Sequence, residues 1–220
     1  MKIIQIKEEN IERAGEVLAL AFAGDPIFQY IFQSDEAYQK HAAWLFSTWV
    51  RWSRQNGLAM MTEDGNAVLL ARRPQETSMS FISFIRAGML PLPFRVGWKI
   101  FRRFYFNVVP LLERKHDEVM GSEGHWYGWM IAAAPGHEGL GLRLMQYSAQ
   151  LADNDLLPYY LETATERDVA LYAHFGFKVK EQVSLTGNNL TLYFMVREPR
   201  VIRRVTVAIA LPQTQTINGI

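Results

Sequence analysis

Hydrophobic positions recur along the chain with two different periods. Short alternating or wholly apolar runs predict β-strands, and apolar residues at every third or fourth position predict helices. The predicted strands cover residues 2–6, 58–62, 67–72, 126–133, 159–161, 177–185 and 190–196. The predicted helices cover residues 8–22, 26–32, 35–56, 139–153 and 167–174. This alternation of strands and helices indicates a single α/β domain.

Turn residues separate these elements. Gly24 and Pro26 end the first helix, because glycine accepts a left-handed cap and proline lacks the N–H that a helix needs. The sequences Glu63-Asp64-Gly65-Asn66 and Gly187-Asn188-Asn189 each stand between two predicted strands. Both are typical of β-hairpin turns.

Residues 77–120 follow neither period. Aromatic and basic residues are interleaved there, and Pro91, Pro93 and Pro110 divide the segment into pieces of helical length. We predict two or three short helices that cover one side of the fold. Interleaved arginine and phenylalanine are also found where proteins contact membranes or nucleic acids. We favour a lid whose apolar face packs on the sheet and whose charged ends reach water.

Composition narrows the functional classes. The 220 residues are 49% hydrophobic and 20% charged, with a net charge of +1 and no cysteine. The balanced charge gives no general attraction to nucleic acid, and the lack of cysteine excludes disulfides and thiolate chemistry. The sequence has no apolar stretch of signal-peptide or membrane-spanning length. We therefore expect a cytoplasmic protein with neither a nucleic-acid nor a membrane partner.

The stretch from residue 125 to 177 is the strongest candidate for chemistry. An apolar strand ends at Pro135, Gly139 and Gly141 follow, and an amphipathic helix begins at once. The first amides of a helix lack acceptors inside the helix and attract anions such as phosphate. The turn is not a P-loop, since no Gly-Lys-Ser/Thr follows. It also lacks the third glycine and the acidic residue of a dinucleotide-binding turn.

This stretch resembles the GNAT superfamily of acyl-coenzyme A-dependent N-acetyltransferases. The family pattern V-x-P followed by [QR]-x-x-G-x-[GA] matches Ala133-Ala134-Pro135 and residues 138–143. The downstream pattern L-Y-x-x-x-G-F is present as Leu171-Tyr172-Ala173-His174-Phe175-Gly176-Phe177. Residues 21–26 and 193–198 are similar to the end of the first helix and to the last strand of such enzymes, so most of residues 1–199 is covered.

The resemblance implies that acetyl-CoA is a co-substrate. Its pyrophosphate would lie on the amides of residues 138–143, and its pantetheine would follow the strand that ends at Ala133. An amide near Ile131 or Ala132 would polarise the thioester carbonyl. The implied coenzyme-binding positions are Ile131, Ala132, Ala133, Glu138, Gly139, Leu140, Gly141, Leu142, Arg143 and Thr165.

This chain departs from the family pattern at three of those positions, one of which is Thr165, where an asparagine often helps to hold the pantetheine. Glu138 stands in place of glutamine or arginine, and Arg143 stands in place of glycine or alanine. The backbone amides that would hold the pyrophosphate are supplied by any residue. Arg143 would add a positive charge near the phosphates.

Tyr172 matches the family's general acid, which protonates the leaving thiolate. Without the resemblance, a core tyrosine on an amphipathic helix is the better interpretation. The attacking amine also needs a base, for which the candidates are Glu123, His125, Tyr127 and Glu162. We expect Glu162 to be a solvated carboxylate at a strand end. His41, His116 and His174 have no second ligand at metal-binding spacing, so we expect no metal.

The implied fold is α/β: a mixed, mostly antiparallel sheet with helices on both faces and a central pair of splayed strands. Residues 1–199 form the acetyltransferase domain, with 77–120 as a helical cover on the acceptor side. Residues 200–220 form a tail with one possible extra strand, which could support a homodimer.

The implied function is acetyl transfer from acetyl-CoA to a primary amine of a small molecule or a protein. The cover could shape a pocket for an amine with apolar or aromatic bulk. Two alternatives stay open: transfer of a longer acyl group, and a module that binds coenzyme A without turnover.

Overall fold

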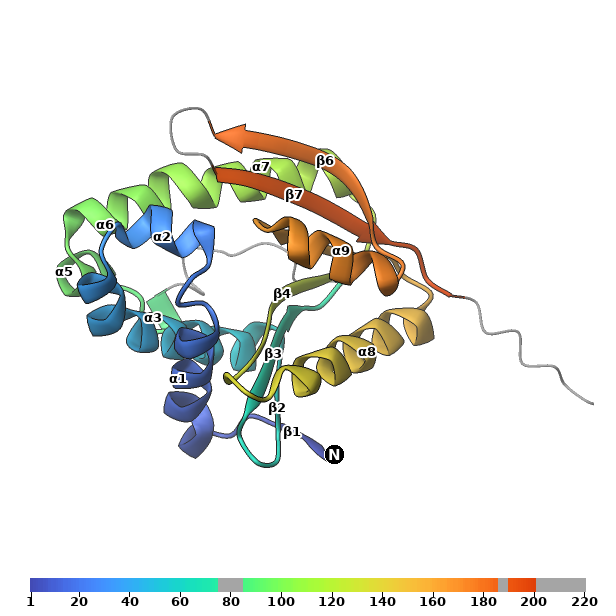
Figure 1. Ribbon diagram of the computed structural model, residues 1–220, viewed down its shortest axis with the longest axis horizontal. Coiled ribbons are helices and arrows are strands. Elements are labelled where there is room, and N and C mark those ends of the chain that lie inside the picture. Colours follow the sequence, from blue (N-terminus) through green and yellow to red (C-terminus); the bar gives the residue numbers. More distant parts are fainter. Residues whose placement is uncertain (75–84, 186–189, 201–220) are drawn as a thin grey trace, which may run out of the picture.

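A seven-stranded sheet with the order β1-β2-β3-β4-β5-β7-β6 organises the computed structural model, which describes residues 1–74, 85–185 and 190–200 (Figure 1). The strands are β1 (Ile3–Gln5), β2 (Leu58–Thr62), β3 (Ala67–Arg72), β4 (Trp126–Ala133), β5 (Tyr159–Thr163), β6 (Lys178–Leu185) and β7 (Leu190–Arg197). Neighbouring strands are antiparallel except for β4 and β5, which are parallel. The expected mixed, mostly antiparallel sheet is confirmed.

The helices lie close to where the hydrophobic periods predict them. They are α1 (Ile11–Ala21), α2 (Pro26–Phe32), α3 (Asp35–Asn56), α5 (Leu92–Val96), α6 (Trp98–Arg102), α7 (Val109–Met120), α8 (Glu138–Asp155) and α9 (Glu166–His174). A 3₁₀ turn, η1 (Glu8–Asn10), precedes α1, and a π-helical segment, η2 (Arg103–Val108), joins α6 to α7. Asp25 and Ser34 cap α2 and α3 by accepting backbone N–H groups, which fixes where both helices begin.

Three apolar clusters fasten the helices to the two faces of the sheet. One cluster joins α1, α2 and α3 to β2, β3 and β4, and another joins α7 to β4, β5 and β7 on the same face. The third joins α8 and α9 to the opposite face. The helical covering of both faces, visible in Figure 1, is therefore confirmed.

A β-bulge shapes the middle of β4. Leu70 pairs with Met130 and Ala71 pairs with Gly128, so Trp129 has no partner on β3. Trp129 and Met130 consequently both pack into the cluster of α1 and α3. Gly128 is required because a Cβ atom there would lie 2.8 Å from the hydroxyl of Tyr159.

β4 and β5 pair only at their first residues. The register joins Trp126 to Tyr159 and Tyr127 to Tyr160, and no later residues of these two fully described strands pair with each other. The strands diverge beyond that point. This is the expected splayed pair, and it leaves an opening in the middle of the sheet.

The part of the predicted cover that the structure describes is helical, as expected, and comprises α5, α6, η2 and α7. It packs inward through Leu92, Val96 and Val108, whereas Phe94 and Trp98 are exposed. Residues 77–84 of the cover, the turn at 187–189 and the predicted tail strand lie outside the described residues.

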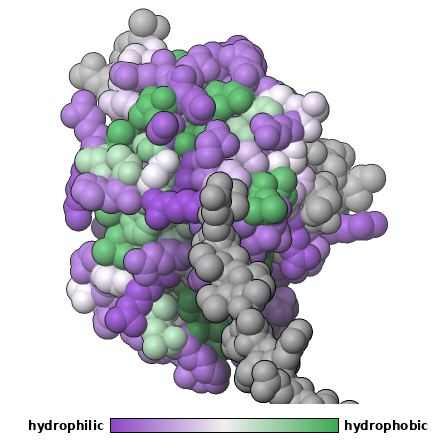
Figure 2. All heavy atoms as spheres, turned by 90° about the vertical axis from the view of Figure 1, so that its right-hand side faces the viewer, coloured by the Kyte–Doolittle hydropathy of each residue, from purple (hydrophilic) through white to green (hydrophobic). Residues whose placement is uncertain are grey.

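The outer surface on the α8 side carries mainly hydrophilic side chains (Figure 2). Among the described helices, none combines the length and the apolar character that crossing a bilayer requires.

Candidate active site

A cavity of about 150 Å³ lies where β4 and β5 diverge. It is lined from both faces of the sheet: Tyr127 and Glu162 belong to the α7 face, and Asp168 and Tyr172 come from α9 on the other. Apolar and aromatic side chains from α2, α3, η2 and α7 complete its walls. The opening between the strands thus connects the two sides of the molecule.

Glu162 is the most perturbed carboxylate of the cavity. Its Oε1 atom accepts a hydrogen bond from the hydroxyl of Tyr127, and its Oε2 atom is buried with no hydrogen-bond partner among the described residues. Burial raises the pKa of Glu162 to about 7, against the opposing effects of the Tyr127 hydrogen bond and the charge of Arg72. Our expectation of a solvated strand-end carboxylate was wrong. The neighbouring strand and α7 enclose this side chain, and β5 alone does not reveal them.

Arg72 fixes the surroundings of that carboxylate. Its Nη1 atom donates to Glu113 Oε1 at 2.9 Å, and its guanidinium lies over the rings of Tyr127 and Trp129, 4.7 and 5.0 Å from their centroids. The buried ion pair and the stacked rings hold Tyr127 in place. Burial, followed by the charge of Glu162, raises the pKa of Tyr127, so its hydroxyl remains a donor.

The other two candidate bases lie outside the cavity lining. Glu123 is exposed, and His125 is buried beside His116, with their Nε2 atoms 2.7 Å apart. His125 Nδ1 lies 2.6 Å from the Glu123 carbonyl, which can only accept, so in the neutral pair His116 Nε2 donates to His125 Nε2. Burial lowers the pKa of both rings, that of His116 to about 4.

No sequence pattern indicates this histidine pair, because α7 and the residue before β4 come together only in the fold. The described part of the chain contains no group of three or more side chains that could hold a metal ion.

Tyr172 lies where the motif places it, on α9 and in the wall of the cavity. Its ring packs against Phe177, with a centroid separation of 5.9 Å. Burial, reinforced by the charge of Asp168, raises the pKa of Tyr172 above its ordinary value. The side chain is therefore a neutral hydroxyl that can donate a proton into the opening.

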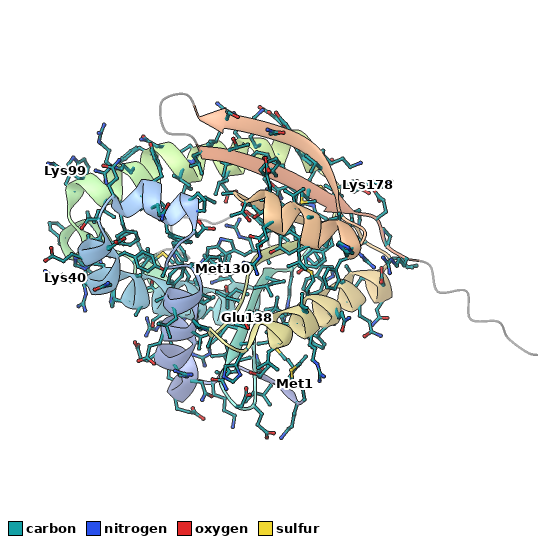
Figure 3. All side chains as sticks on the ribbon, viewed as in Figure 1. Met1, Lys40, Lys99, Met130, Glu138 and Lys178 are labelled. Atoms are coloured by element: carbon teal, nitrogen blue, oxygen red, sulfur yellow. The ribbon has the colours of Figure 1, made fainter. Side chains whose placement is uncertain are left out.

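Helix α8 begins at Glu138, an exposed residue that is labelled in Figure 3. The Glu138 carboxylate accepts the backbone N–H of Gly136 at 3.0 Å. Hydrogen bonds from its own amide and from Gly136 lower the pKa of Glu138. The turn thus already holds an oxyanion on its amides, which is the chemistry expected of a phosphate site.

The remaining residues of the turn, 139–143, differ in their exposure. Gly139, Leu142 and Arg143 are exposed, and Leu140 and Gly141 are half-buried. A Cβ atom on Gly141 would lie 3.7 Å from that of Ala133, so α8 packs closely on β4, whereas Gly139 faces open space. Along β4, Ile131 lines the cavity, Ala132 is buried and Ala133 is half-buried.

Thr165 has a structural role that the sequence comparison did not anticipate. Its hydroxyl oxygen accepts the backbone N–H of Asp168 at 3.1 Å and caps α9. Arg167, in the first turn of α9, is the last of several groups that lower the pKa of Glu138, after the backbone hydrogen bonds to that carboxylate. Arg167 belongs to neither motif, so no sequence pattern selects it.

Two further residues of the cavity were not predicted as site residues. The sequence pattern predicts only that the first helix ends near Asp25 and that a strand ends at Arg72, yet both residues line the cavity. Their positions depend on how α2 and β3 pack against β4, and the local sequence around each residue does not predict that packing. An Asp immediately before a helix-starting proline is simply a common cap.

Comparison with known proteins finds many similar structures and a similar sequence, of which three are described below, while no family model matches the chain. An uncharacterised N-acetyltransferase of Schizosaccharomyces pombe is 25% identical over 203 residues, which is 89% of this chain and 82% of that protein. A crystal structure from Corynebacterium glutamicum, described as a histone acetyltransferase and related acetyltransferase, superposes with a TM-score of 0.59 at 19% identity, covering 91% of this chain and 97% of the other. Arylalkylamine N-acetyltransferase 2 of Aedes aegypti gives a TM-score of 0.56 at 14% identity, covering 90% and 99%.

Proposed function

We propose that this chain, which has the fold of solved acetyltransferases and is 25% identical to an N-acetyltransferase of Schizosaccharomyces pombe, is a GNAT-type enzyme that transfers the acetyl group of acetyl-CoA to a primary amine by direct attack. The observation that carries this proposal is the cavity at the diverging strands, with Glu162 and Tyr172 both in its walls. A nucleophile and a thioester that enter from opposite faces of the sheet would meet between those two side chains.

The coenzyme's pyrophosphate fits the start of α8. The amides there already bind the carboxylate of Glu138, so they accept an oxyanion in the same way that they would accept a phosphate. Arg143 and Arg167 would supply positive charge around the pyrophosphate once it replaces that carboxylate. The amides of residues 138–143 would make the contacts, and Ile131, Ala132 and Ala133 would line the pantetheine.

Glu162 is the proposed general base. An alkylamine enters mainly as an ammonium ion at neutral pH, and a carboxylate with a pKa of about 7 is well matched to accept its proton. The free Oε2 atom is the acceptor, because Oε1 already holds the Tyr127 hydroxyl. Tyr127 is therefore a positioning residue rather than a base.

Bond making and breaking then follow directly. The amine nitrogen forms a bond to the thioester carbonyl carbon, and an amide near Ile131 or Ala132 donates to the oxygen, which gains negative charge. The carbon–sulfur bond breaks, and Tyr172 donates its proton to the departing thiolate. The nitrogen loses two protons in all: the one that Glu162 takes from the ammonium is released to water, and the second, lost as the amide forms, replaces the one that Tyr172 gave to the thiolate. Thr165 would contact the pantetheine with its hydroxyl proton, while its oxygen caps α9.

A second candidate is a module that binds coenzyme A without turnover. It is kept open by the departures of Glu138 and Arg143 from the family pattern, since the Glu138 carboxylate accepts the amide N–H of Gly136 beside the proposed phosphate turn. Replacing Glu138 with Gln removes the competing charge. If the Glu138 carboxylate weakens coenzyme binding, Glu138→Gln should bind acetyl-CoA severalfold more tightly in calorimetry. An unchanged or weaker affinity would show that Glu138 does not compete with the coenzyme.

Calorimetry with acetyl-CoA, followed by thiol release over a panel of primary amines, tests the main proposal. We expect binding and amine-dependent release, and a loss of about 10²- to 10⁴-fold in turnover for Glu162→Gln. Glu181→Gln is a suitable control, since Glu181 lies on β6 and pairs with Lys115 away from the cavity. Binding without release from any amine would favour the non-catalytic module.

A further inference from the structure

The acceptor side of the cavity has a continuous aromatic wall. The ring of Trp49 lies 6.0 Å from Phe28, 5.4 Å from Phe104 and 5.5 Å from Trp129, measured between centroids. These four side chains come from α2, η2, α3 and β4, and all of them line the cavity. Such a wall is matched by a flat or apolar ligand body, and it offers few groups that could replace the water around a polar one.

The charges of the cavity are strongly unequal. Asp25, Glu162 and Asp168 all line it, and among the lining residues Arg72 is the sole cation. Arg72 is already engaged by Glu113 and by the rings stacked on its guanidinium. The cavity therefore favours a ligand with positive charge and opposes one with negative charge.

Asp25, Asp168 and Tyr172, the proposed acid, all line the cavity. Burial raises the pKa of Asp25 to about 6, and the charge of Asp168 adds to that rise. Burial and then the charges of Asp168 and Asp25 raise the pKa of Tyr172. The two carboxylates therefore repel each other within the cavity that both line. A bound ammonium would relieve the repulsion between the two carboxylates.

On this basis we propose that the acceptor is a primary monoamine with an aromatic or apolar body and no carboxylate, and that Asp25 helps to hold its ammonium group. The inference rests on the proposed acetyl transfer and names the substrate class of the same site. The apolar body lies against the wall of Trp49 and Trp129. The ammonium lies at the end that holds Asp25, within the cavity that Glu162 also lines.

Two matched pairs of amines test the substrate class. 2-Phenylethylamine and phenylalanine differ only by a carboxylate, which would face Asp25, Asp168 and Glu162. We expect kcat/KM to be about a hundredfold higher for 2-phenylethylamine. Butylamine and putrescine differ by a second ammonium, which would be buried among aromatic rings near Arg72. We expect about a tenfold preference for butylamine. Equal or reversed preference within either pair overturns the substrate class, while thiol release itself still supports acetyl transfer.

Binding separates the two proposals if no amine releases thiol. In that case 2-phenylethylamine and phenylalanine are titrated into the coenzyme A complex and their affinities compared. Tighter binding of 2-phenylethylamine retains the ligand class even though acetyl transfer has failed. Equal binding, or no binding of either compound, overturns the ligand class as well.

Asp25→Asn tests the anchor. Asparagine can still accept the backbone N–H groups of Ile27 and Phe28, so the cap of α2 is kept while the charge is lost. We expect KM for 2-phenylethylamine to rise about tenfold or more, with acetyl-CoA affinity unchanged. Asp35→Asn removes the same charge from the exposed start of α3 and should leave both values unchanged. An unchanged KM in a folded Asp25→Asn protein overturns the role of Asp25.

Discussion

The hydrogen bond between Tyr127 and Glu162 makes a specific prediction about pH dependence. Tyr127→Phe removes the hydroxyl but keeps the ring that lies over Arg72 and against Tyr160. The hydroxyl donates to the ionised carboxylate, so it stabilises that form and lowers the pKa of Glu162. Its loss should raise the pKa above the value of about 7 and leave the base protonated, and therefore inactive, up to a higher pH.

The size of the shift follows from the energy of the lost bond. A hydrogen bond to a charged group contributes about 1.5–3 kcal/mol, and one pKa unit corresponds to about 1.4 kcal/mol. In Tyr127→Phe, the apparent pKa on the acid side of the pH profile of kcat/KM should therefore rise by about one to two units. Activity at pH 7 should fall by about 5- to 50-fold, because the ionised fraction of Glu162 drops from about one half, and activity should recover at high pH.

The assay is thiol release measured from about pH 5.5 to 10 with one amine at low concentration. Because every variant is assayed with the same amine, protonation of the amine affects all of the pH profiles equally. Tyr147→Phe is the control, because Tyr147 lies half-buried on α8 and does not line the cavity. The reasoning fails if this apparent pKa is unchanged in Tyr127→Phe, or if Glu162→Gln keeps the wild-type value.

Three other variants test separate parts of the molecule. Tyr172→Phe should lower kcat by about 10²-fold or more while leaving acetyl-CoA affinity unchanged, since only the proton donor is lost; unchanged turnover would remove Tyr172 from the mechanism. Gly139→Glu should weaken acetyl-CoA binding in calorimetry by adding bulk and negative charge to the phosphate turn. Gly124→Glu, at a second exposed glycine with open space around it, should not; equal affinities in the two variants would show that the turn does not hold pyrophosphate. Burial lowers the pKa of His116 to about 4 in the folded protein, against 6.5 in the unfolded chain. The free energy of unfolding should therefore fall as the pH is lowered from 6.5 to 4, by a total of about 3 kcal/mol. His116→Gln should flatten that dependence in urea titrations, and a slope identical to wild type would contradict the assignment.

The elements of the fold were predictable because their signals are local. The sequence places α2, α3 and β4 at the residues where the structure has them, since capping residues, glycines and hydrophobic periods act over a few neighbouring positions. The same holds for the turn at the start of α8 and for Tyr172, whose motifs occupy contiguous residues. Those motifs were sufficient to predict the fold, and acetyl-CoA as the co-substrate stays a prediction.

The chemistry of the acceptor side was decided by packing between distant segments. Glu162 has the same local sequence whether it is solvated or enclosed. It is mainly burial in the folded protein that raises its pKa, against the opposing effects of the hydrogen bond from Tyr127 on β4 and the charge of Arg72 on β3. The pairing of His116 with His125 and the placement of Asp25 in the cavity have the same origin. A pKa depends on burial and on charges within a few ångströms, and in this protein those neighbours come from strands and helices far apart in the sequence.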